Sequence, residues 1–246
     1  MLPIDLQIIK YIFFEKPIYY YKIRPYLNSD RHKQLFVRLQ EYKNPEVAGK
    51  SLLEIDYTIF DLETTGFIPE IGHEIISIGA VRMNGLDTIH NKTFYKLVKP
   101  IRPVSKQTFK LTGLTKEHLE QSDSFLDSLQ EFLAFSEGSV LVAHPAMFDM
   151  RFVQTMLKRW KLPKMSTPVI DSQKLAKFLY PGQKPQLDPL LKKFNIKSRK
   201  RHHALNDAIM TAELFGCLLK ELTSKEDHTF HELKHLLYEQ QKARSL

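Results

Sequence analysis

The stretch Tyr57-Thr-Ile-Phe-Asp-Leu-Glu-Thr-Thr-Gly66 alternates β-forming residues and ends in a turn-forming sequence, which is typical of a strand and its exit turn. Asp61 and Glu63 stand two positions apart, so their side chains point to the same face of the sheet. Carboxylates in an apolar strand are costly to bury unless they are solvated or neutralised, and a divalent cation neutralises paired oxygen ligands. The strand therefore predicts either a metal site or a face that is open to water.

The segments after this strand alternate between strand and helix patterns. Two further strands are expected at 74–82 and 93–98, joined by a hairpin across Asn84-Gly85. Short apolar segments predict strands at 139–143 and 169–170, and helices are expected at 124–135, 148–160, 175–179, 187–194 and 204–222. Such an alternation indicates an α/β fold, in which helices wrap around a sheet.

The sequence pattern divides the chain into three parts. Residues 1–54 are expected to form a mostly helical extension rich in aromatic residues, with its boundary near Ser51. Residues 55–222 would form the main domain, and 223–246 a C-terminal helix. The tyrosines at 19–21 are expected to pack against the main domain rather than to stack on bases.

Two later segments carry further acidic side chains. Asp149 lies just inside the helix that follows the buried strand at 139–143, where the helix dipole also favours an acid. His202 and Asp207 lie at the start of the last long helix, and five residues correspond to about 140° of rotation, so the two could not share one helix face. We therefore expect His202 in the preceding loop, leaning over the site, with Asp207 pointing in from the first turn.

Five sequence motifs occur in a fixed order along the chain. They are Asp-Leu-Glu-Thr-Thr-Gly (61–66), Gly-His-Glu-Ile-Ile-Ser-Ile-Gly-Ala-Val (72–81), Leu-Thr-Gly-Leu-Thr (111–115), Val-Ala-His-Pro-Ala-Met-Phe-Asp (142–149) and His-His-Ala-Leu-Asn-Asp-Ala (202–208). In this order they resemble the DEDDh 3′-5′ exonucleases, the family of the epsilon proofreading subunit of the bacterial replicative DNA polymerase. The resemblance covers residues 55–222.

This resemblance implies an RNase H-like fold, with a mixed five-stranded sheet flanked by helices and preceded here by the helical extension. It implies a metal-dependent hydrolase that releases nucleoside monophosphates from the 3′ end of DNA, in proofreading or repair. By motif position the catalytic and metal-binding acids would be Asp61, Glu63, Asp149 and Asp207, around two Mg²⁺ or Mn²⁺ ions. His202 would be the general base, since the ordinary pKa of histidine is near 6.5, whereas His203 occupies a position that is commonly Arg.

The substrate-binding residues would lie around the first and fourth motifs. They are expected to be Thr64, Thr65, Gly66, Phe67 and His144. Thr64, Thr65 and Gly66 would lie against the terminal nucleotide, and we expect the Phe67 ring to act as a wedge on which a base stacks. Pro145 stands where the family usually has Asn, so any contact that the Asn side-chain amide makes in the family is not carried over to this chain.

The net charge of +8, from 36 basic and 28 acidic residues, favours a polyanionic partner. Basic residues gather in two windows without acids, 88–116 and 189–206. Each window is predicted to face phosphates or, alternatively, to be a solvated face. The expected partners are thus nucleic acid, as single-stranded 3′ ends, and a DNA polymerase subunit in the case of proofreading.

Composition excludes several other classes of protein. The single cysteine, Cys217, excludes an intramolecular disulfide and a multi-cysteine zinc site, and it indicates a reducing, cytoplasmic environment. No apolar stretch approaches the ~20 residues that span a membrane, so no membrane association is expected. His231-Glu-Leu-Lys-His235 matches the HExxH zinc pattern, but only 11 residues follow it, which leaves little room for a third ligand.

Two alternative functions fit the same residues. A 3′-5′ exoribonuclease acting on short RNA would carry the same motifs, because the contact to a 2′-hydroxyl leaves no readable pattern here. A non-catalytic nucleic-acid-binding module would use the basic windows while its acids face solvent. The substitution Asp61→Ala separates this last alternative, since a binding module would lose no activity.

Overall fold

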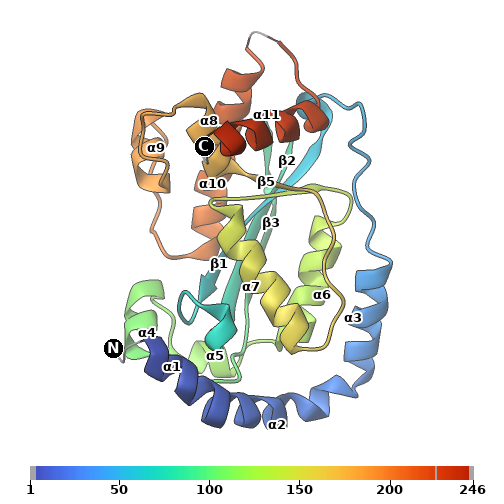
Figure 1. The fold of residues 1–246 in the computed structure, drawn as a ribbon, viewed down its shortest axis with the longest axis vertical. Coiled ribbons are helices and arrows are strands. Elements are labelled where there is room, and N and C mark those ends of the chain that lie inside the picture. The colour runs from blue at the N-terminus through green and yellow to red at the C-terminus, as the bar shows by residue number, and fades with distance from the viewer. Residues whose placement is uncertain (1–3, 225, 244–246) are drawn as a thin grey trace.

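A mixed five-stranded sheet forms the centre of the structure, which is a computed structural model describing residues 4–224 and 226–243 (Figure 1). The strands lie in the order β3-β2-β1-β4-β5. Their bounds are Asp56–Thr64 for β1, Ile75–Asn84 for β2, Asp87–Leu97 for β3, Val140–Ala143 for β4 and Val169–Asp171 for β5. β1, β2 and β3 pair antiparallel, whereas β4 pairs parallel with both β1 and β5. The predicted fold class is confirmed.

The predicted hairpin is also confirmed. Asn84 pairs with Asp87, and Gly85 lies between them with a positive φ of 51°, a conformation that glycine adopts without strain. β3 starts at Asp87 rather than at residue 93, because its pairing with β2 continues to the turn.

Helices cover both faces of this sheet (Figure 1). α6 (Phe125–Ser136) and α7 (Ala146–Arg159) cover one face, and α8 (Ser172–Leu179), α9 (Leu187–Lys193) and α10 (Ala204–Leu222) cover the other. These helices confirm the predicted positions to within a few residues. Two short helices were missed by the sequence analysis, α4 (Lys106–Thr112) and α5 (Lys116–Glu120). The signal for them was present, because the Ser105 and Thr115 side chains cap their first turns.

Successive residues of β1 alternate between two hydrophobic cores. Phe60 packs on Phe132 of α6 with ring centroids 5.5 Å apart, in the core that α6 and α7 cover. Tyr57 packs on Phe215 of α10 with ring centroids 5.1 Å apart, in the other core. Because side chains alternate along a strand, the odd-numbered Asp61 and Glu63 point to the face that carries α10. The strand thus places both acids where the start of α10 can reach them.

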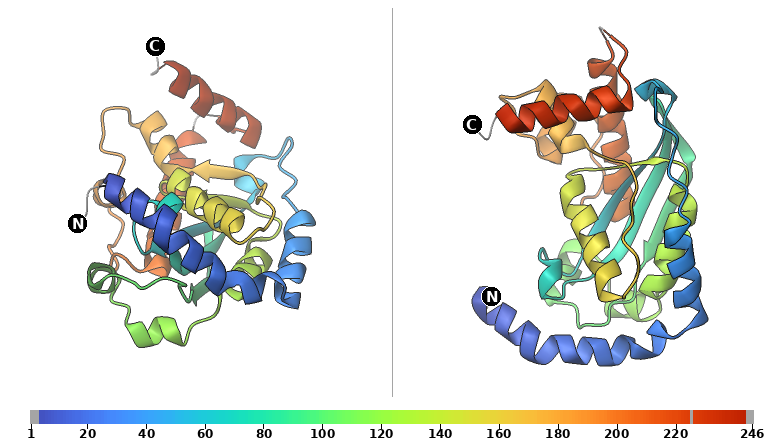
Figure 2. Two further views of the ribbon diagram at one scale, coloured as in Figure 1. Left: turned by 60° about the horizontal axis from the view of Figure 1, so that its bottom comes forward. Right: turned by 45° about the vertical axis from the view of Figure 1, so that its right-hand side comes forward.

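The extension before β1 is helical, as predicted, and curves along one end and one side of the domain (Figure 2). It consists of α1 (Ile4–Lys10), a π-helical turn (Tyr11–Glu15), α2 (Lys16–Leu27) and α3 (Asp30–Gln40). Tyr19, Ile23 and Leu35 are buried in the same core as Phe60. The predicted packing of the aromatic segment is confirmed for Tyr19, and the core continues across the boundary predicted at residue 54.

The last helix, α11 (Phe230–Ala243), packs on the second core through Phe230 and Leu233. Its HExxH glutamate, Glu232, accepts hydrogen bonds from the backbone and the hydroxyl of Thr229 at 2.7 and 3.0 Å, so it closes the first turn of its own helix. Within residues 4–224 and 226–243, no helix combines the length and the apolar character needed to cross a bilayer.

Candidate active site

Three acidic side chains meet at the end of β1. Asp61 and Glu63 reach this point from the strand, and Asp207 reaches it from the first turn of α10. One carboxylate oxygen of each lies within 4.8 Å of the others. Glu63 and Asp207 are buried, and Asp61 is half-buried. The structure thus brings together three of the four acids predicted from the sequence as one compact set of oxygen ligands.

A glycine in β2 allows α10 to approach the strand acids. Gly79 pairs with Asp61 across the β1–β2 ladder. A Cβ atom at this position would overlap the backbone of Ala204 and Leu205 at the start of α10. Close contact between helix and strand therefore requires glycine here, and it sets the position of the first turn, which carries Asp207.

The fourth predicted acid, Asp149, lies beside this group. It is buried in the first turn of α7, where the backbone N–H of Leu62 donates a hydrogen bond to its carboxylate. Burial raises the pKa of Asp149 well above its ordinary value, and the hydrogen bond from Leu62 opposes this rise. Asp149 also raises the pKa of Asp61 through its charge. Its position suits it to hold a second ion rather than to complete the group of three.

The acids share a strongly unfavourable negative charge. Burial raises the pKa of Asp61 well above its ordinary value, and the charges of Asp149, Asp207 and Glu63 raise it further. Burial, followed by the charge of Asp207, raises the pKa of Glu63 to about 8. A buried set of mutually repelling carboxylate oxygens is the donor set that Mg²⁺ and Mn²⁺ prefer. The residues present therefore fit the divalent cations that the sequence predicts.

The two adjacent histidines before α10 take different positions. His202 lies in the loop, as predicted, with a left-handed φ of 59°, and its backbone N–H donates to Asp207 Oδ2 at 3.1 Å. Its imidazole is close enough that its charge contributes to lowering the pKa of Asp207, which burial raises. The His203 ring instead stacks on Tyr95 with centroids 4.5 Å apart. His202 is thus the histidine placed beside the acids.

Arg201 is a site residue that the sequence analysis assigned only to a basic window. Its guanidinium contacts Asp207, and its Nε lies 2.8 Å from Asp188 Oδ1. The positive charge of Arg201 lowers the pKa of Asp61 and Glu63, against the larger effect of burial. Arg201 directly precedes His202 in the last motif, and this adjacency was the signal available in the sequence.

The loop after β1 is held by hydrogen bonds to the start of β2. The Thr65 backbone N–H donates to the Glu74 carbonyl at 2.9 Å, and the Glu74 N–H donates to the Thr65 hydroxyl at 2.9 Å. The Thr64 hydroxyl donates to the Gly66 carbonyl at 2.7 Å, and a Cβ atom on Gly66 would overlap the His73 ring. The loop therefore has a fixed shape next to the acids, which suits a surface for the terminal nucleotide.

Phe67 and His144 differ in their availability to a substrate. The Phe67 side chain is 74% exposed, and its ring centroid lies 6.4 Å from that of Phe148. Both ring nitrogens of His144 form hydrogen bonds within the protein, Nδ1 with the Ser172 hydroxyl at 2.9 Å and Nε2 with the Pro185 carbonyl at 2.7 Å. The contacts of His144 favour a role in fixing the loop at Pro185, and its contact with substrate stays a prediction.

Ion pairs neutralise part of the first basic window. Lys96 pairs with Asp123 and Glu131, and Arg102 pairs with Glu15 of the helical extension. Lys106 and Lys110 of α4 are exposed. The window is therefore partly a set of structural ion pairs and partly a set of exposed lysines, which include Lys106 and Lys110.

Residues 58–215 match the family model RNase_T, described as an exonuclease, and this range contains every predicted acid. The PolC-type DNA polymerase III of Streptococcus mutans is 38% identical over 181 residues, covering 73% of this chain and 12% of that protein. The PolC-type DNA polymerase III of Thermotoga maritima is 38% identical over 159 residues, covering 65% and 11%. The chain thus spans about an eighth of the length of these curated relatives.

Two solved structures show a similar fold. Exonuclease X in complex with 5′ overhanging duplex DNA has a TM-score of 0.59 and 24% identity, and the match covers 74% of this chain and 99% of that one. The nuclease domain of 3′hExo, a DEDDh family member bound to rAMP, has a TM-score of 0.62 and 22% identity, covering 68% and 93%. The fold built around the acids is therefore the fold of these nucleases.

Proposed function

The chain belongs to the exonuclease family, and from this premise we propose that it is a divalent-metal-dependent 3′-5′ exonuclease that releases nucleoside monophosphates from DNA. The observation that carries this proposal is the group of carboxylate oxygens from Asp61, Glu63 and Asp207 within 4.8 Å of one another. DNA is favoured as substrate because the similar curated proteins are DNA polymerases.

Each acid has a place in the proposed metal site. Asp61, Glu63 and Asp207 would hold one cation, and Asp149 with Asp61 would hold a second. When bound, two divalent cations neutralise charge on the scissile phosphate and lower the pKa of the attacking water. Mg²⁺ and Mn²⁺ both suit this set of oxygen ligands.

The remaining side chains position the substrate and move the proton. His202 accepts the proton of the attacking water from its place in the loop beside Asp207. The loop at 64–66 supports the terminal nucleotide, because its backbone is fixed against Glu74. The exposed Phe67 ring offers a surface on which the terminal base stacks.

A DNA polymerase is the protein partner that we propose. In the PolC-type relatives, the region similar to this chain is part of a polymerase. The helical extension exposes large apolar side chains at Ile4, Ile9, Ile12, Phe13, Phe14, Ile18 and Tyr21. Exposed apolar side chains that gather on one segment are typical of a protein interface. We expect Phe13→Ser with Phe14→Ser to abolish co-elution with the polymerase while nuclease activity is retained, and unchanged co-elution would refute this role.

The enzymatic proposal is tested with single-stranded DNA and RNA labelled at the 5′ end. With Mg²⁺ we expect a ladder of DNA products that shortens one nucleotide at a time from the 3′ end, and no products in EDTA. Asp207→Asn is expected to abolish the ladder, whereas Glu41→Gln, a matched change on an exposed residue, is expected to leave it unchanged. Faster trimming of RNA would overturn the DNA assignment, and activity in EDTA would overturn the metal mechanism.

A further inference from the structure

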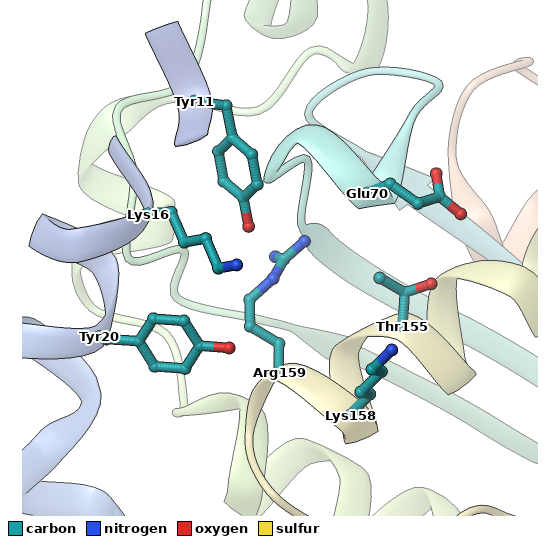
Figure 3. Close-up of a pocket in the computed structure, with 7 residues that line it drawn as sticks. All are labelled: Tyr11, Lys16, Tyr20, Glu70, Thr155, Lys158 and Arg159. Carbon is teal, nitrogen blue, oxygen red and sulfur yellow. The ribbon is translucent and has the colours of Figure 1, made fainter. Parts of the chain in front are cut away.

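A basic pocket lies between the helical extension and the C-terminal end of α7 (Figure 3). Its volume is about 360 Å³. Its lining includes Tyr11, Lys16 and Tyr20 from the extension and Thr155, Lys158 and Arg159 from α7. The pocket is separate from the acidic site, and it exists only because the extension packs against the domain.

The cations of this pocket are only partly balanced by acidic side chains. The Arg159 guanidinium is buried and fixed, since it donates to the His73 carbonyl at 3.2 Å and lies 5.0 Å from the Tyr19 ring centroid. Glu70 at the rim is already neutralised by Arg151, with two contacts of 2.7 and 2.6 Å. The charge of Arg159 also acts on the buried Glu74 carboxylate, whose pKa it lowers against the larger effect of burial. The charge that an anion could still balance therefore comes from the two lysines of the pocket.

Lys16 and Lys158 carry positive charge that no acidic side chain neutralises within the described residues. Lys16 and Lys158 are exposed, and neither forms an ion pair or a side-chain hydrogen bond with any residue in the described ranges 4–224 and 226–243. The Lys16 amino group extends towards the Arg159 guanidinium, and the Tyr20 hydroxyl faces the same space (Figure 3). Like charges that converge without an anion repel one another, so this arrangement suits a phosphate, to which the hydroxyls can also donate.

The pocket lies at one end of a surface that starts at the active site. Asp149 and Lys158 are nine residues apart on α7, which corresponds to about 14 Å along the helix axis and about 180° of rotation, so a strand that joins them also passes from the buried to the exposed side of the helix. Met147, Arg151 and Lys158 are exposed, and with Thr155 their spacing of four, four and three residues places them on one face of α7. A stacked strand needs at least about four nucleotides to cover this axial length.

We propose that this pocket binds backbone phosphates of the substrate strand, at least about four nucleotides upstream of the 3′ end. That the bound strand is the substrate of the nuclease rests on the proposed function. Lys16 and Lys158 supply the charge, the buried Arg159 adds a positive charge at a fixed position, and the exposed face of α7 guides the strand between pocket and acids. The extension thus makes the affinity of the enzyme depend on the length of its substrate.

The test compares two double variants of the full chain. Lys16→Gln with Lys158→Gln removes the free charges of the pocket. Lys220→Gln with Lys234→Gln removes the same charge from exposed lysines of α10 and α11, at the other end of the molecule (Figure 1). Binding of single-stranded DNA of 2 and 12 nucleotides is measured by fluorescence anisotropy in EDTA, where no hydrolysis occurs.

Two lost phosphate contacts on single-stranded DNA change the slope of log affinity against log salt by about 1.4, or about 25-fold in affinity at 0.1 M salt. We expect this loss for the 12-mer with the pocket variant, and no loss for the 2-mer or with the control variant. Equal affinity of the two variants for the 12-mer would overturn the proposal, as would an equal loss for the 2-mer. Since this binding needs no catalysis, failure of the nuclease proposal is seen separately, as absence of hydrolysis by the unmodified protein in Mg²⁺.

Discussion

Glu63→Gln is the substitution whose effect on stability follows most directly from the site. Burial and the charge of Asp207 raise the pKa of Glu63 from 4.5 to about 8. Between these values the folded protein keeps the proton and the unfolded chain releases it, so the metal-free protein loses stability as the pH rises from 4.5 to 8. Glutamine resembles the protonated side chain in shape and carries no charge, so the variant escapes this loss.

The magnitude follows from the span between the two pKa values. Each pH unit is worth about 1.4 kcal/mol, so the raised pKa of Glu63 lowers the free energy of unfolding by about 1 kcal/mol at pH 5 and by at most about 4 kcal/mol at pH 8, relative to pH values well below 4.5. We therefore expect Glu63→Gln to raise the free energy of unfolding in EDTA by up to these amounts relative to the unmodified protein. Saturating Mn²⁺ should remove the advantage at pH 8, because the ion stabilises the ionised form.

Urea denaturation in EDTA at several pH values, followed by circular dichroism, measures this difference. Glu41→Gln changes the same chemical group on an exposed residue and serves as control. A Glu63→Gln variant whose stability relative to the unmodified protein is the same at pH 5 and pH 8 would refute the reasoning that the acids repel one another in a buried site.

Three further substitutions test the general base, the approach of α10 to the sheet and the packing of the extension. His202→Ala should slow hydrolysis about 10²- to 10⁴-fold while Mn²⁺ affinity is retained, and stopped-flow assays with calorimetry separate these effects. Gly79→Ala should displace the start of α10 and lower stability by about 1–3 kcal/mol together with Mn²⁺ affinity, whereas Gly182→Ala, where a Cβ meets open space, should change neither. Ile23→Ala should cost about 2–5 kcal/mol in urea denaturation because Ile23 is buried in the shared core, and a smaller loss than for the exposed Ile18→Ala would contradict that packing.

The sequence was sufficient to predict the parts of the site that depend on local geometry. Asp61 and Glu63 are two positions apart in β1, which predicted that they share one face of the sheet, because side chains alternate along any strand. The rotation of a helix likewise separated His202 from Asp207, and the structure places His202 in the loop. The order of the motifs indicated the family, and the resemblance to that family predicted the mixed five-stranded sheet.

Contacts between distant segments could not be predicted in this way. Arg201 lies between Asp188 and Asp207, and the engagement of His144 with Pro185 depends on a loop 41 residues away. The packing of the extension against Arg159 creates the basic pocket, and no local pattern marks it. Such contacts depend on how complete elements pack, which periodicity within one element does not encode.

Calorimetric titration of the metal-free protein with Mn²⁺ at pH 8 tests the acidic site most directly. We predict that the unmodified chain binds two ions and releases protons on binding, and that Asp61→Asn loses this binding while Glu41→Gln keeps it. Absence of Mn²⁺ binding by the unmodified chain, or binding by Asp61→Asn with equal affinity and stoichiometry, would contradict a metal centre built from the acids of β1, α7 and α10.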